Sequence, residues 1–135
     1  MNSKKVLVLC TGNSCRSIIA EALINAFLDG VEAKSSGVRS SGRVNPLAKK
    51  VLEQNAIWDE SYHSKTLDEV MDVEYDLVVT VCDHAKESCP VFPKNTKVIH
   101  IGFEDPDGKE YKEFEKTYHD IKNILLPKVL DAIGR

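Results

Sequence analysis

The stretch KKVLVLCTGNSCRS, residues 4–17, joins a continuous apolar run to a short polar loop. The apolar run, Lys5–Cys10, is rich in Val and Leu, which is typical of a strand buried on both faces of a sheet. From Ser17 onward, apolar side chains recur at helical spacing as far as the Asp29-Gly30 pair. We therefore predict a strand, a tight loop and a helix, with a cysteine at the carboxyl end of the strand.

A loop in this position is suited to binding an anion. Its backbone N–H groups join the unsatisfied N–H groups of the first helical turn, and such a concave set of donors binds a tetrahedral anion. The planar guanidinium of Arg16 can contact two oxygens of the anion, and Gly12 and Asn13 tolerate the left-handed backbone of a tight loop. We expect the anion-binding loop to comprise Thr11, Gly12, Asn13, Ser14, Cys15 and Arg16.

Cys10 is the candidate nucleophile of this loop. The positive field of the loop is expected to lower the pKa of the Cys10 thiol, so that a thiolate forms near neutral pH. The hydroxyl of Ser17 could donate a hydrogen bond to that thiolate. A bare Cys-x5-Arg pattern also fits a buried cysteine at a structural turn, but its place between a buried strand and an amphipathic helix favours a functional loop.

The rest of the chain alternates between predicted strands and helices. The strands are Glu32–Ser36, Tyr75–Val81 and Lys97–Ile101; the helices are Pro46 to about Gln54 with Asn45 as N-cap, about Thr66 to Met71, and Lys109–Ile133 with a kink or interruption at Pro127. This alternation predicts a parallel sheet with right-handed crossovers and helices on both faces. Since ligands gather at the carboxyl ends of such strands, Cys10, Cys82 and the loop after Ile101 should share one edge.

Composition limits the class of protein. The 135 residues are 42% hydrophobic and 29% charged, which predicts one soluble globular domain over residues 1–135. The net charge of −3 comes without a basic stripe, so nucleic-acid binding is not expected. No apolar run is long enough to span a membrane, and we expect a cytoplasmic monomer.

The four cysteines, Cys10, Cys15, Cys82 and Cys89, allow three interpretations. A structural disulfide framework is disfavoured in a cytosolic chain of this size. A zinc site is disfavoured because neither tight Cys-x2-Cys pairs nor suitably spaced histidines are present. Catalytic or redox-active cysteines are the interpretation that we favour, with Cys15 expected to support the shape of the loop.

The segment Cys10–Ser17 resembles the Cys-x5-Arg-Ser loop of the low-molecular-weight protein tyrosine phosphatases and of the thioredoxin-coupled arsenate reductases that share their fold. The resemblance covers nearly the whole chain in length and element order. It implies a four-stranded parallel sheet flanked by helices on both faces, with the anion-binding loop after the first strand.

Two further cysteines favour the reductases. Cys82 directly follows a predicted buried strand, and Cys89 lies seven residues later on a polar segment before Pro90. These positions match the second and third cysteines of the arsenate reductase family. The resemblance implies a Cys10–Cys82 disulfide, then a Cys82–Cys89 disulfide that thioredoxin reduces, and residues 82–92 are expected to rearrange between the redox states.

Asp105, directly before Pro106, is the candidate general acid. The same residues could simply form a turn ahead of the last helix. The resemblance favours the catalytic role, since both families keep an Asp-Pro in this loop. The phosphatases usually continue with an aromatic residue, whereas Asp107 follows here, which favours the reductases.

A potassium site is a further implication of the resemblance. Asn13, Glu21 and Ser36 match three of its side-chain ligands in the reductases, but Thr66 stands where the fourth, an aspartate, would fall. The ammonium group of Lys65 could replace the ion. No tightly bound cofactor is expected.

We therefore predict an arsenate reductase that uses Cys10, Arg16, Ser17, Cys82, Cys89 and Asp105 and that binds phosphate or sulfate as arsenate analogues. The alternatives are a low-molecular-weight protein tyrosine phosphatase, in which Cys82 and Cys89 are idle, and a redox-sensing module without an enzymatic activity. Glutaredoxin with glutathione remains open as the reductant. His84, His100, His119, Trp58 and Tyr62 are expected on the surface or in packing.

Overall fold

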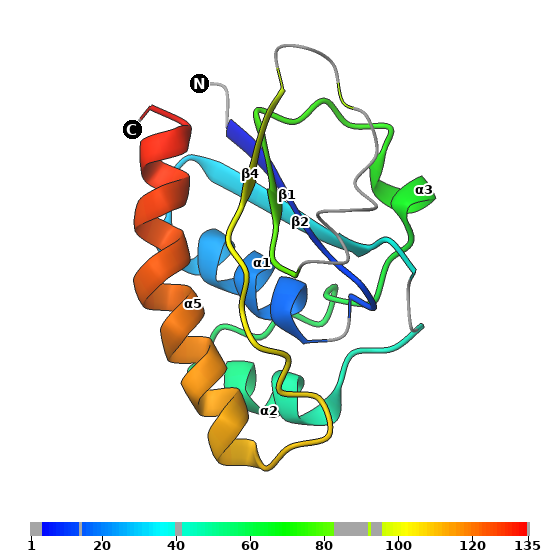
Figure 1. Cartoon of the computed structure of the whole chain (residues 1–135), viewed down its shortest axis with the longest axis vertical. Coiled ribbons are helices and arrows are strands. Elements are labelled where there is room, and N and C mark those ends of the chain that lie inside the picture. Colours follow the sequence, from blue (N-terminus) through cyan, green and yellow to red (C-terminus); the bar gives the residue numbers. More distant parts are fainter. Residues whose placement is uncertain (1–3, 14, 40–41, 83–91, 93–95, 135) are drawn as a thin grey trace.

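The computed structural model describes residues 4–13, 15–39, 42–82, 92 and 96–134. Its elements are β1 (Lys4–Cys10), α1 (Arg16–Phe27), β2 (Val31–Gly37), α2 (Pro46–Gln54), α3 (Leu67–Val70), β3 (Leu77–Thr80), β4 (Lys97–His100) and α5 (Tyr111–Ala132), shown in Figure 1. Strands and helices alternate as the sequence predicts.

The sheet is parallel and has the strand order β2-β1-β3-β4. Its central strand β1 pairs with β2 on one side and β3 on the other, and the residues Val6–Leu9 are fully buried. Leu9 lies opposite both Ser36 and Thr80, so β1, β2 and β3 end at the same edge of the sheet. This edge is where the sequence places the functional residues.

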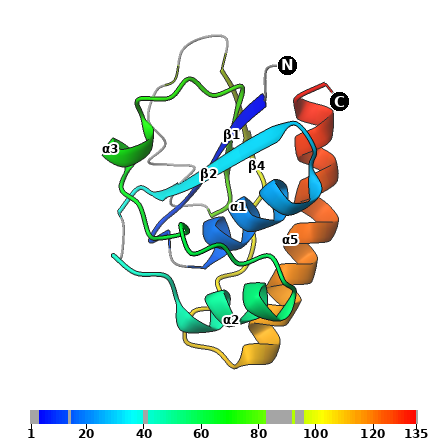
Figure 2. The same ribbon diagram turned by 180° about the vertical axis from the view of Figure 1, so that it is seen from behind.

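Helices flank this sheet. Helix α1 packs directly on β1 and β2, while α5 and α2 pack against α1 and against each other, and α3 contacts β2. Figures 1 and 2 show α1 lying crosswise to α5, with α2 beside the end of α5 that is farther from the C-terminus. The predicted fold, a four-stranded parallel sheet flanked by helices, is confirmed.

Two helices differ in how well the sequence anticipates them. Helix α2 begins as predicted, with Pro46 in its first turn and with Asn45 Oδ1 accepting a hydrogen bond of 2.8 Å from the N–H of Leu47. Helix α5, by contrast, continues through Pro127, where the sequence predicts a kink or interruption. Pro127 and Asn123 both lie on the exposed side of α5, so the carbonyl that loses its partner faces water.

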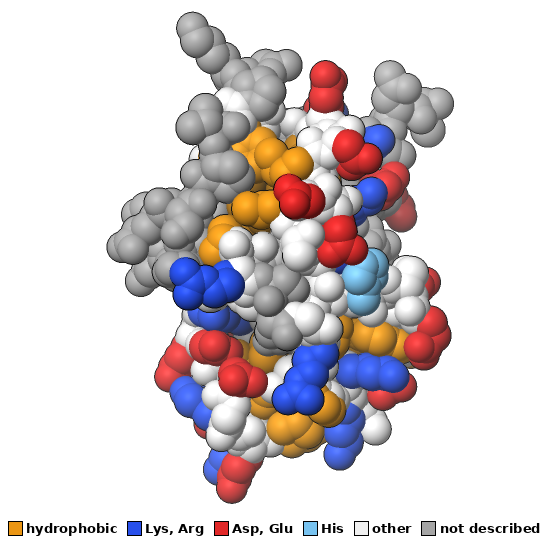
Figure 3. All heavy atoms as spheres, turned by 90° about the vertical axis from the view of Figure 1, so that its right-hand side faces the viewer, with side chains coloured by type: hydrophobic (Ala, Val, Ile, Leu, Met, Phe, Trp, Pro, Cys, Tyr) orange, Lys and Arg blue, Asp and Glu red, His pale blue; other side chains and the backbone are white. Residues whose placement is uncertain are grey.

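The surface carries charges of both signs. On the face that includes α3, acidic and basic side chains are interspersed (Figure 3). Over the part of the chain that the structure describes, none of the helices combines the length and the apolar character needed to cross a bilayer.

Candidate active site

The loop between β1 and α1 is shaped by contacts with the residues that follow β2. The carbonyl oxygens of Cys10 and Thr11 accept hydrogen bonds from the N–H groups of Val38 and Arg39, at 3.0 and 2.9 Å. Asn13 adopts the left-handed backbone conformation, with φ of 51°, that the sequence predicts for this tight loop. Ser14 lies outside the described residues, and Cys15 is the buried N-cap residue of α1.

Gly37, the last residue of β2, lies directly against this loop. A Cβ atom at this position would lie 2.6 Å from the carbonyl oxygen of Thr11 and 2.9 Å from the carbonyl carbon of Gly12. Both neighbours are backbone atoms that cannot rotate away. The loop therefore keeps its shape only with a glycine at the end of β2.

The sulfur of Cys10 lies at the base of the loop and is 2% exposed. The Ser17 hydroxyl is 2.8 Å from Cys10 Sγ, and the N–H of Asn13 donates to the same sulfur at 3.2 Å. Burial raises the pKa of the Cys10 thiol, while hydrogen bonds from Ser17 and Asn13 and the charge of Arg16 act in the opposite direction. The predicted lowering of the Cys10 pKa is therefore wrong, because desolvation outweighs the donors.

Asn13 fixes the direction of the hydrogen bond between Ser17 and Cys10. Its side-chain amide donates to Ser17 Oγ at 2.7 Å and to Ser35 Oγ at 2.9 Å, and its Oδ1 accepts from the N–H of Lys65 at 2.6 Å. Because Ser17 Oγ accepts from Asn13, its own hydrogen is available to the sulfur. Ser17 is thus placed as the predicted donor to the thiolate.

A buried ion pair extends this network away from the nucleophile. Ser35 Oγ donates to Glu21 Oε1 at 2.6 Å, and Lys65 Nζ is 3.4 Å from the same oxygen and donates to the carbonyl of His63 at 2.9 Å. The side chains of Lys65 and Glu21 are only 8% and 6% exposed. Burial raises the pKa of Glu21, and the charge of Lys65 and the hydrogen bond from Ser35 counteract it.

The residues expected at a potassium site have the following contacts in the structure. Asn13 and Glu21 do approach each other, but the serine between them is Ser35. The hydroxyl of Ser36 instead donates to the carbonyls of Gly37 and Lys65, at 3.2 and 3.3 Å. Neighbouring residues of a strand point to opposite faces, so the period-2 alternation of β2 is the signal that could have identified Ser35.

Lys65 Nζ lies beside Glu21, as the replacement of the ion by an ammonium group requires. Among the described residues, no group of three or more His, Cys, Asp and Glu side chains could hold a metal ion.

A second thiol lies at the same edge of the sheet. Cys82, just beyond β3, is buried, and its sulfur is 3.2 Å from the hydroxyl of Thr11 in the anion loop. The structure therefore brings Cys82 next to the loop that holds Cys10, as predicted, while Cys89 lies outside the described residues.

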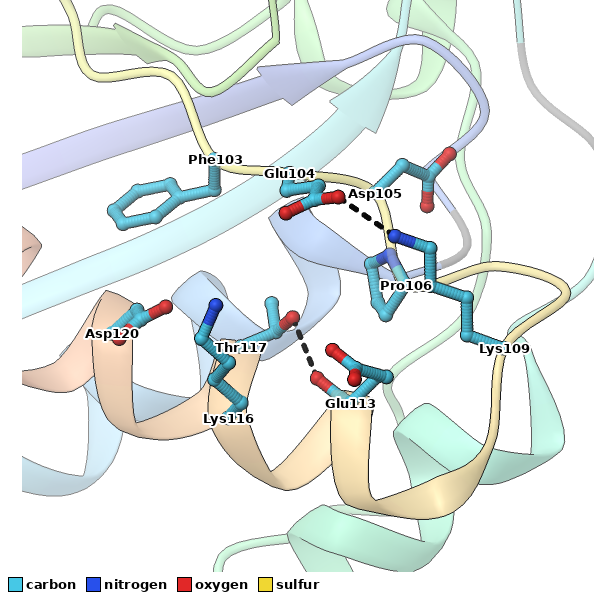
Figure 4. A pocket seen from close by; sticks show the side chains of 9 residues that line it. All are labelled: Phe103, Glu104, Asp105, Pro106, Lys109, Glu113, Lys116, Thr117 and Asp120. Carbon is cyan, nitrogen blue, oxygen red and sulfur yellow. Dashed lines mark hydrogen bonds and ion pairs between the residues drawn. The ribbon is translucent and has the colours of Figure 1, made fainter.

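Arg16 and Asp105 meet across the rim of the loop. Arg16 Nη2 is 3.3 Å from Asp105 Oδ2, and Nη1 donates to the carbonyl of Phe103 at 3.1 Å. The side chain of Asp105 is 49% exposed, and Figure 4 shows its carboxylate pointing away from the side chains of α5. The predicted acid and the predicted anion-binding arginine are thus in direct contact.

The remaining aromatic residues and histidines have packing contacts. Trp58 and Tyr62 pack edge to face with ring centroids 5.7 Å apart, and the ring of His119 lies against Tyr118. His100 Nδ1 is 2.8 Å from the hydroxyl of Thr80. His84 lies outside the described residues.

In total, the described site combines a sulfur at the end of a strand, a loop that can surround a tetrahedral anion, an arginine, a carboxyl group on the rim and a second thiol nearby. The first four groups suit attack by sulfur on a tetrahedral oxyanion. The second thiol suits disulfide exchange after that attack.

Known proteins are similar to this chain in sequence and in fold. The family model for low molecular weight phosphotyrosine protein phosphatase matches residues 5–134. The arsenate reductase of Staphylococcus aureus (strain N315) is 39% identical over 123 residues, which are 90% of this chain and 93% of that protein. Among solved structures, an arsenate reductase from Archaeoglobus fulgidus is similar with a TM-score of 0.77 at 33% identity, covering 96% of this chain and 99% of that one.

A low molecular weight protein tyrosine phosphatase from T. tengcongensis has a TM-score of 0.79 at 27% identity, with coverage of 96% and 99%. The chain therefore belongs to the low molecular weight phosphotyrosine protein phosphatase family and, within it, to the arsenate reductases.

Proposed function

We propose that this protein reduces arsenate to arsenite and that thioredoxin reduces the protein disulfide formed in that reaction. The observation that carries the proposal is the buried thiol of Cys82, whose sulfur lies 3.2 Å from the hydroxyl of Thr11 in the anion loop. Hydrolysis of a phosphate ester needs one sulfur nucleophile. Reduction of arsenate needs a second thiol nearby, because that thiol forms a disulfide with the first sulfur and so releases the arsenic.

Arsenate binds in the loop that follows β1. Backbone N–H groups of the anion loop bind its oxygens, and Arg16 turns from Asp105 to the anion. Phosphate and sulfate bind in the same way, because both are tetrahedral oxyanions of similar size.

Cys10 then attacks the arsenic atom. A sulfur–arsenic bond forms, one arsenic–oxygen bond breaks, and the carboxyl group of Asp105 donates its proton to the departing oxygen, which leaves as water. The hydroxyl of Ser17 and the N–H of Asn13 stabilise the negative charge on the sulfur before the attack.

The second step transfers electrons to arsenic. The thiolate of Cys82 attacks the sulfur of Cys10, a disulfide forms, and the electron pair of the sulfur–arsenic bond remains on arsenic, which leaves as arsenite. Cys89 then attacks Cys82 and releases Cys10, and thioredoxin reduces the Cys82–Cys89 disulfide.

We further propose that Lys65 takes the place of a potassium ion beside Glu21, so that no tightly bound cofactor is required. The support is the position of Lys65 Nζ, 3.4 Å from Glu21 Oε1. Arsenate reduction should then be equal in potassium and sodium salts of the same ionic strength. A large stimulation by potassium alone would contradict the replacement.

The test of the function is arsenate-dependent oxidation of NADPH in the presence of thioredoxin and thioredoxin reductase. The intact chain should turn over, whereas Cys10→Ser, Cys82→Ser and Cys89→Ser should not. As a control for folding, Cys82→Ser and Cys89→Ser should still hydrolyse p-nitrophenyl phosphate slowly. The same assay with glutaredoxin and glutathione in place of thioredoxin identifies the reductant. We expect the protein to be a monomer that acts in the cytoplasm, and the molecular mass of the purified protein in solution tests the monomeric state.

A phosphatase is the second candidate function, and the likeness to the T. tengcongensis enzyme supports it. It would use Cys10, Arg16 and Asp105 in the same roles. No turnover of arsenate, together with hydrolysis of phosphate esters that survives both Cys82→Ser and Cys89→Ser, would establish the phosphatase and reject the reductase.

A further inference from the structure

Asp107 is the residue that departs from the phosphatase pattern after the Asp-Pro pair, and the structure gives it a specific partner. The side-chain amide of Asn45 donates a hydrogen bond of 2.7 Å to Asp107 Oδ1. The N–H of Asp107 in turn donates to Asp105 Oδ1 at 3.0 Å. A chain of two hydrogen bonds thus runs from the start of α2 to the candidate general acid.

Asn45 can hold this contact because its own position is fixed. It is the N-cap residue of α2, its Oδ1 accepts from the N–H of Leu47, and its carbonyl accepts from the N–H of Lys49. The oxygen of the side-chain amide therefore caps the helix while the nitrogen is directed at Asp107. One side chain joins a rigid element to the loop that carries Asp105.

Other contacts of this loop lie on either side of Asp105: the N–H of Phe103 donates to the carbonyl of Val81 at 3.1 Å, and Lys109 Nζ donates to Glu104 Oε1 at 2.8 Å. Within residues 102–110 Pro106 is buried, and its neighbours are exposed or half-buried. Between the loop and α5 lies a small cavity of about 20 Å³, lined in part by Glu104, Lys109 and Glu113, as Figure 4 shows. On the α5 side the loop therefore has apolar packing through Phe103 and Pro106, while the side chains of Asp105 and Asp107 stay exposed.

The contact between Arg16 and Asp105 cannot fix the loop during the reaction. The guanidinium of Arg16, which lies 3.3 Å from the Asp105 carboxylate, is the group expected to bind the oxyanion. When Arg16 turns to the anion, Asp105 loses that partner. The hydrogen bonds from Asn45 to Asp107 and from Asp107 to Asp105 are independent of the anion and remain.

We propose that Asn45 is a positioning residue for the general acid: through Asp107 it keeps Asp105 over the anion loop after Arg16 has turned to the substrate. This inference rests on the proposed function, in that Asp105 must act as the acid. Asn45 itself touches neither the substrate nor the sulfur.

The test uses Asn45→Ser, Asp107→Ala and the double variant. Serine caps a helix as well as asparagine does, so Asn45→Ser removes the contact with Asp107 but retains the acceptor for Leu47. Asn55→Ser is the matched control, since Asn55 caps the other end of α2 and its side-chain amide donates to the carbonyl of Val51 at 2.8 Å. The control should retain the wild-type rate.

The readout is the rate of arsenite release in a single turnover without thioredoxin, measured over a range of arsenate concentrations. The maximal rate of each single variant should be about three- to tenfold lower than that of the wild type, which corresponds to the loss of one hydrogen bond. The arsenate concentration at half-maximal rate should change less than about twofold, because the loop and Arg16 bind the anion. The double variant should be no slower than the slower single variant.

The background Asp105→Asn separates positioning from a general loss of structure. In that background Asn45→Ser should cause no further loss, because the acid that it positions is gone. A further loss of the same size, an additive double variant, or a wild-type rate for Asn45→Ser would each overturn the proposal.

Failure of the proposed function is detected separately. If the intact chain does not reduce arsenate, the same variants are compared in hydrolysis of phenyl phosphate, whose poor leaving group needs the same acid. Hydrogen exchange of residues 103–109 gives a readout without turnover, and Asn45→Ser should exchange about three- to tenfold faster there. Unchanged exchange would reject the contact whatever the activity assays give.

Discussion

The hydrogen bonds of Ser17 determine where its hydroxyl hydrogen points. Ser17 accepts from the amide of Asn13 and therefore directs its hydrogen at Cys10. Burial nonetheless raises the pKa of the Cys10 thiol, with the Ser17 hydroxyl as the strongest of the opposing influences. The nucleophile of the resting site is consequently a thiol held in place by groups that favour its thiolate.

This arrangement predicts the pH dependence of the nucleophile. Since the Cys10 pKa lies above the ordinary range of a thiol, its thiolate fraction at neutral pH is small and grows about tenfold with each pH unit until the pKa is passed. Ser17→Ala should raise the pKa further, because it removes a donor to the charged form. Thiolate absorbance in the ultraviolet, taken as the difference from Cys10→Ser, measures both; a complete thiolate at pH 7 in the unliganded protein would contradict the prediction.

Ser35 and Ser36 offer a matched comparison within one strand. Ser35→Ala should cost about 1–3 kcal/mol of unfolding free energy, since it takes a partner from both Asn13 and Glu21 in a buried network. Ser36→Ala should cost less, because its two hydrogen bonds to carbonyls are long, at 3.2 and 3.3 Å. Urea denaturation measures the unfolding free energy of the two variants. A larger loss from Ser36→Ala than from Ser35→Ala would contradict the prediction.

Residues that the sequence predicts well are those whose role follows from local spacing. Cys10, Asn13, Arg16 and Ser17 all lie in one strand-loop-helix segment, and the structure places each as expected except for the pKa of Cys10. That pKa depends on burial by distant parts of the chain. Local sequence carries no measure of such burial, so the direction of the shift could not be predicted.

At the scale of elements, a buried ion pair joins α1 to the segment before α3. Glu21 lies on α1, and Lys65 precedes the N-cap residue of α3; both side chains are less than a tenth exposed. Removal of one charge leaves the other buried without its partner, which is costly, whereas removal of both is tolerated.

We therefore expect Lys65→Met to lower the unfolding free energy by about 3–5 kcal/mol, and the double variant Glu21→Gln, Lys65→Met to recover most of the loss. Lys112→Met is the control, since the pair between Lys112 and Glu110 is 75% and 80% exposed and should contribute less than about 1 kcal/mol. Equal losses from Lys65→Met and the double variant would show that charge pairing is not the reason for the stability.

Helices α2 and α5 show which element boundaries a sequence can define. Asn45 and Pro46 act through bonds within a few residues, so the start of α2 is predictable from local chemistry. The effect of Pro127 depends on which side of α5 faces water, and this is decided by the packing of the whole helix on α1. Local sequence therefore predicts an interruption that the tertiary structure does not require.

At the scale of the whole molecule, the contact between Arg16 and Asp105 joins the carboxyl end of β1 to the loop that follows β4. Asp105 therefore competes with an incoming oxyanion for the guanidinium of Arg16. Binding of an oxyanion must therefore displace a carboxylate, and part of its affinity is offset by that exchange.

Asp105→Asn should accordingly bind phosphate more tightly, by up to about fivefold, since a partly exposed ion pair contributes about 0.2–1 kcal/mol. Glu104→Gln removes the same charge one residue away, where the carboxylate contacts Lys109, and should change the affinity much less. Isothermal titration calorimetry with phosphate tests this, and equal effects of the two variants would indicate general electrostatics in place of direct competition.

The shared edge of the sheet could be predicted from the sequence because parallel strands end together. This rule brings Cys10, Cys82 and the loop of Asp105 to one place although they are far apart along the chain. Which side chains then touch is a matter of strand register and loop path. The contacts of Thr11 with Cys82 and of Asn45 with Asp107 follow from those details, so alternation of strands and helices alone could not predict them.

The close approach of Gly37 to the anion loop has a consequence for directed evolution. Any library that varies this position should return only glycine among active clones, because every side chain begins with a Cβ atom that would press on the backbone of Thr11 and Gly12. The floor of the site on the β2 side is therefore closed to redesign. Variation aimed at a bulkier oxyanion is therefore better placed in the segment around Asp105, where Glu104, Asp105 and Asp107 are exposed.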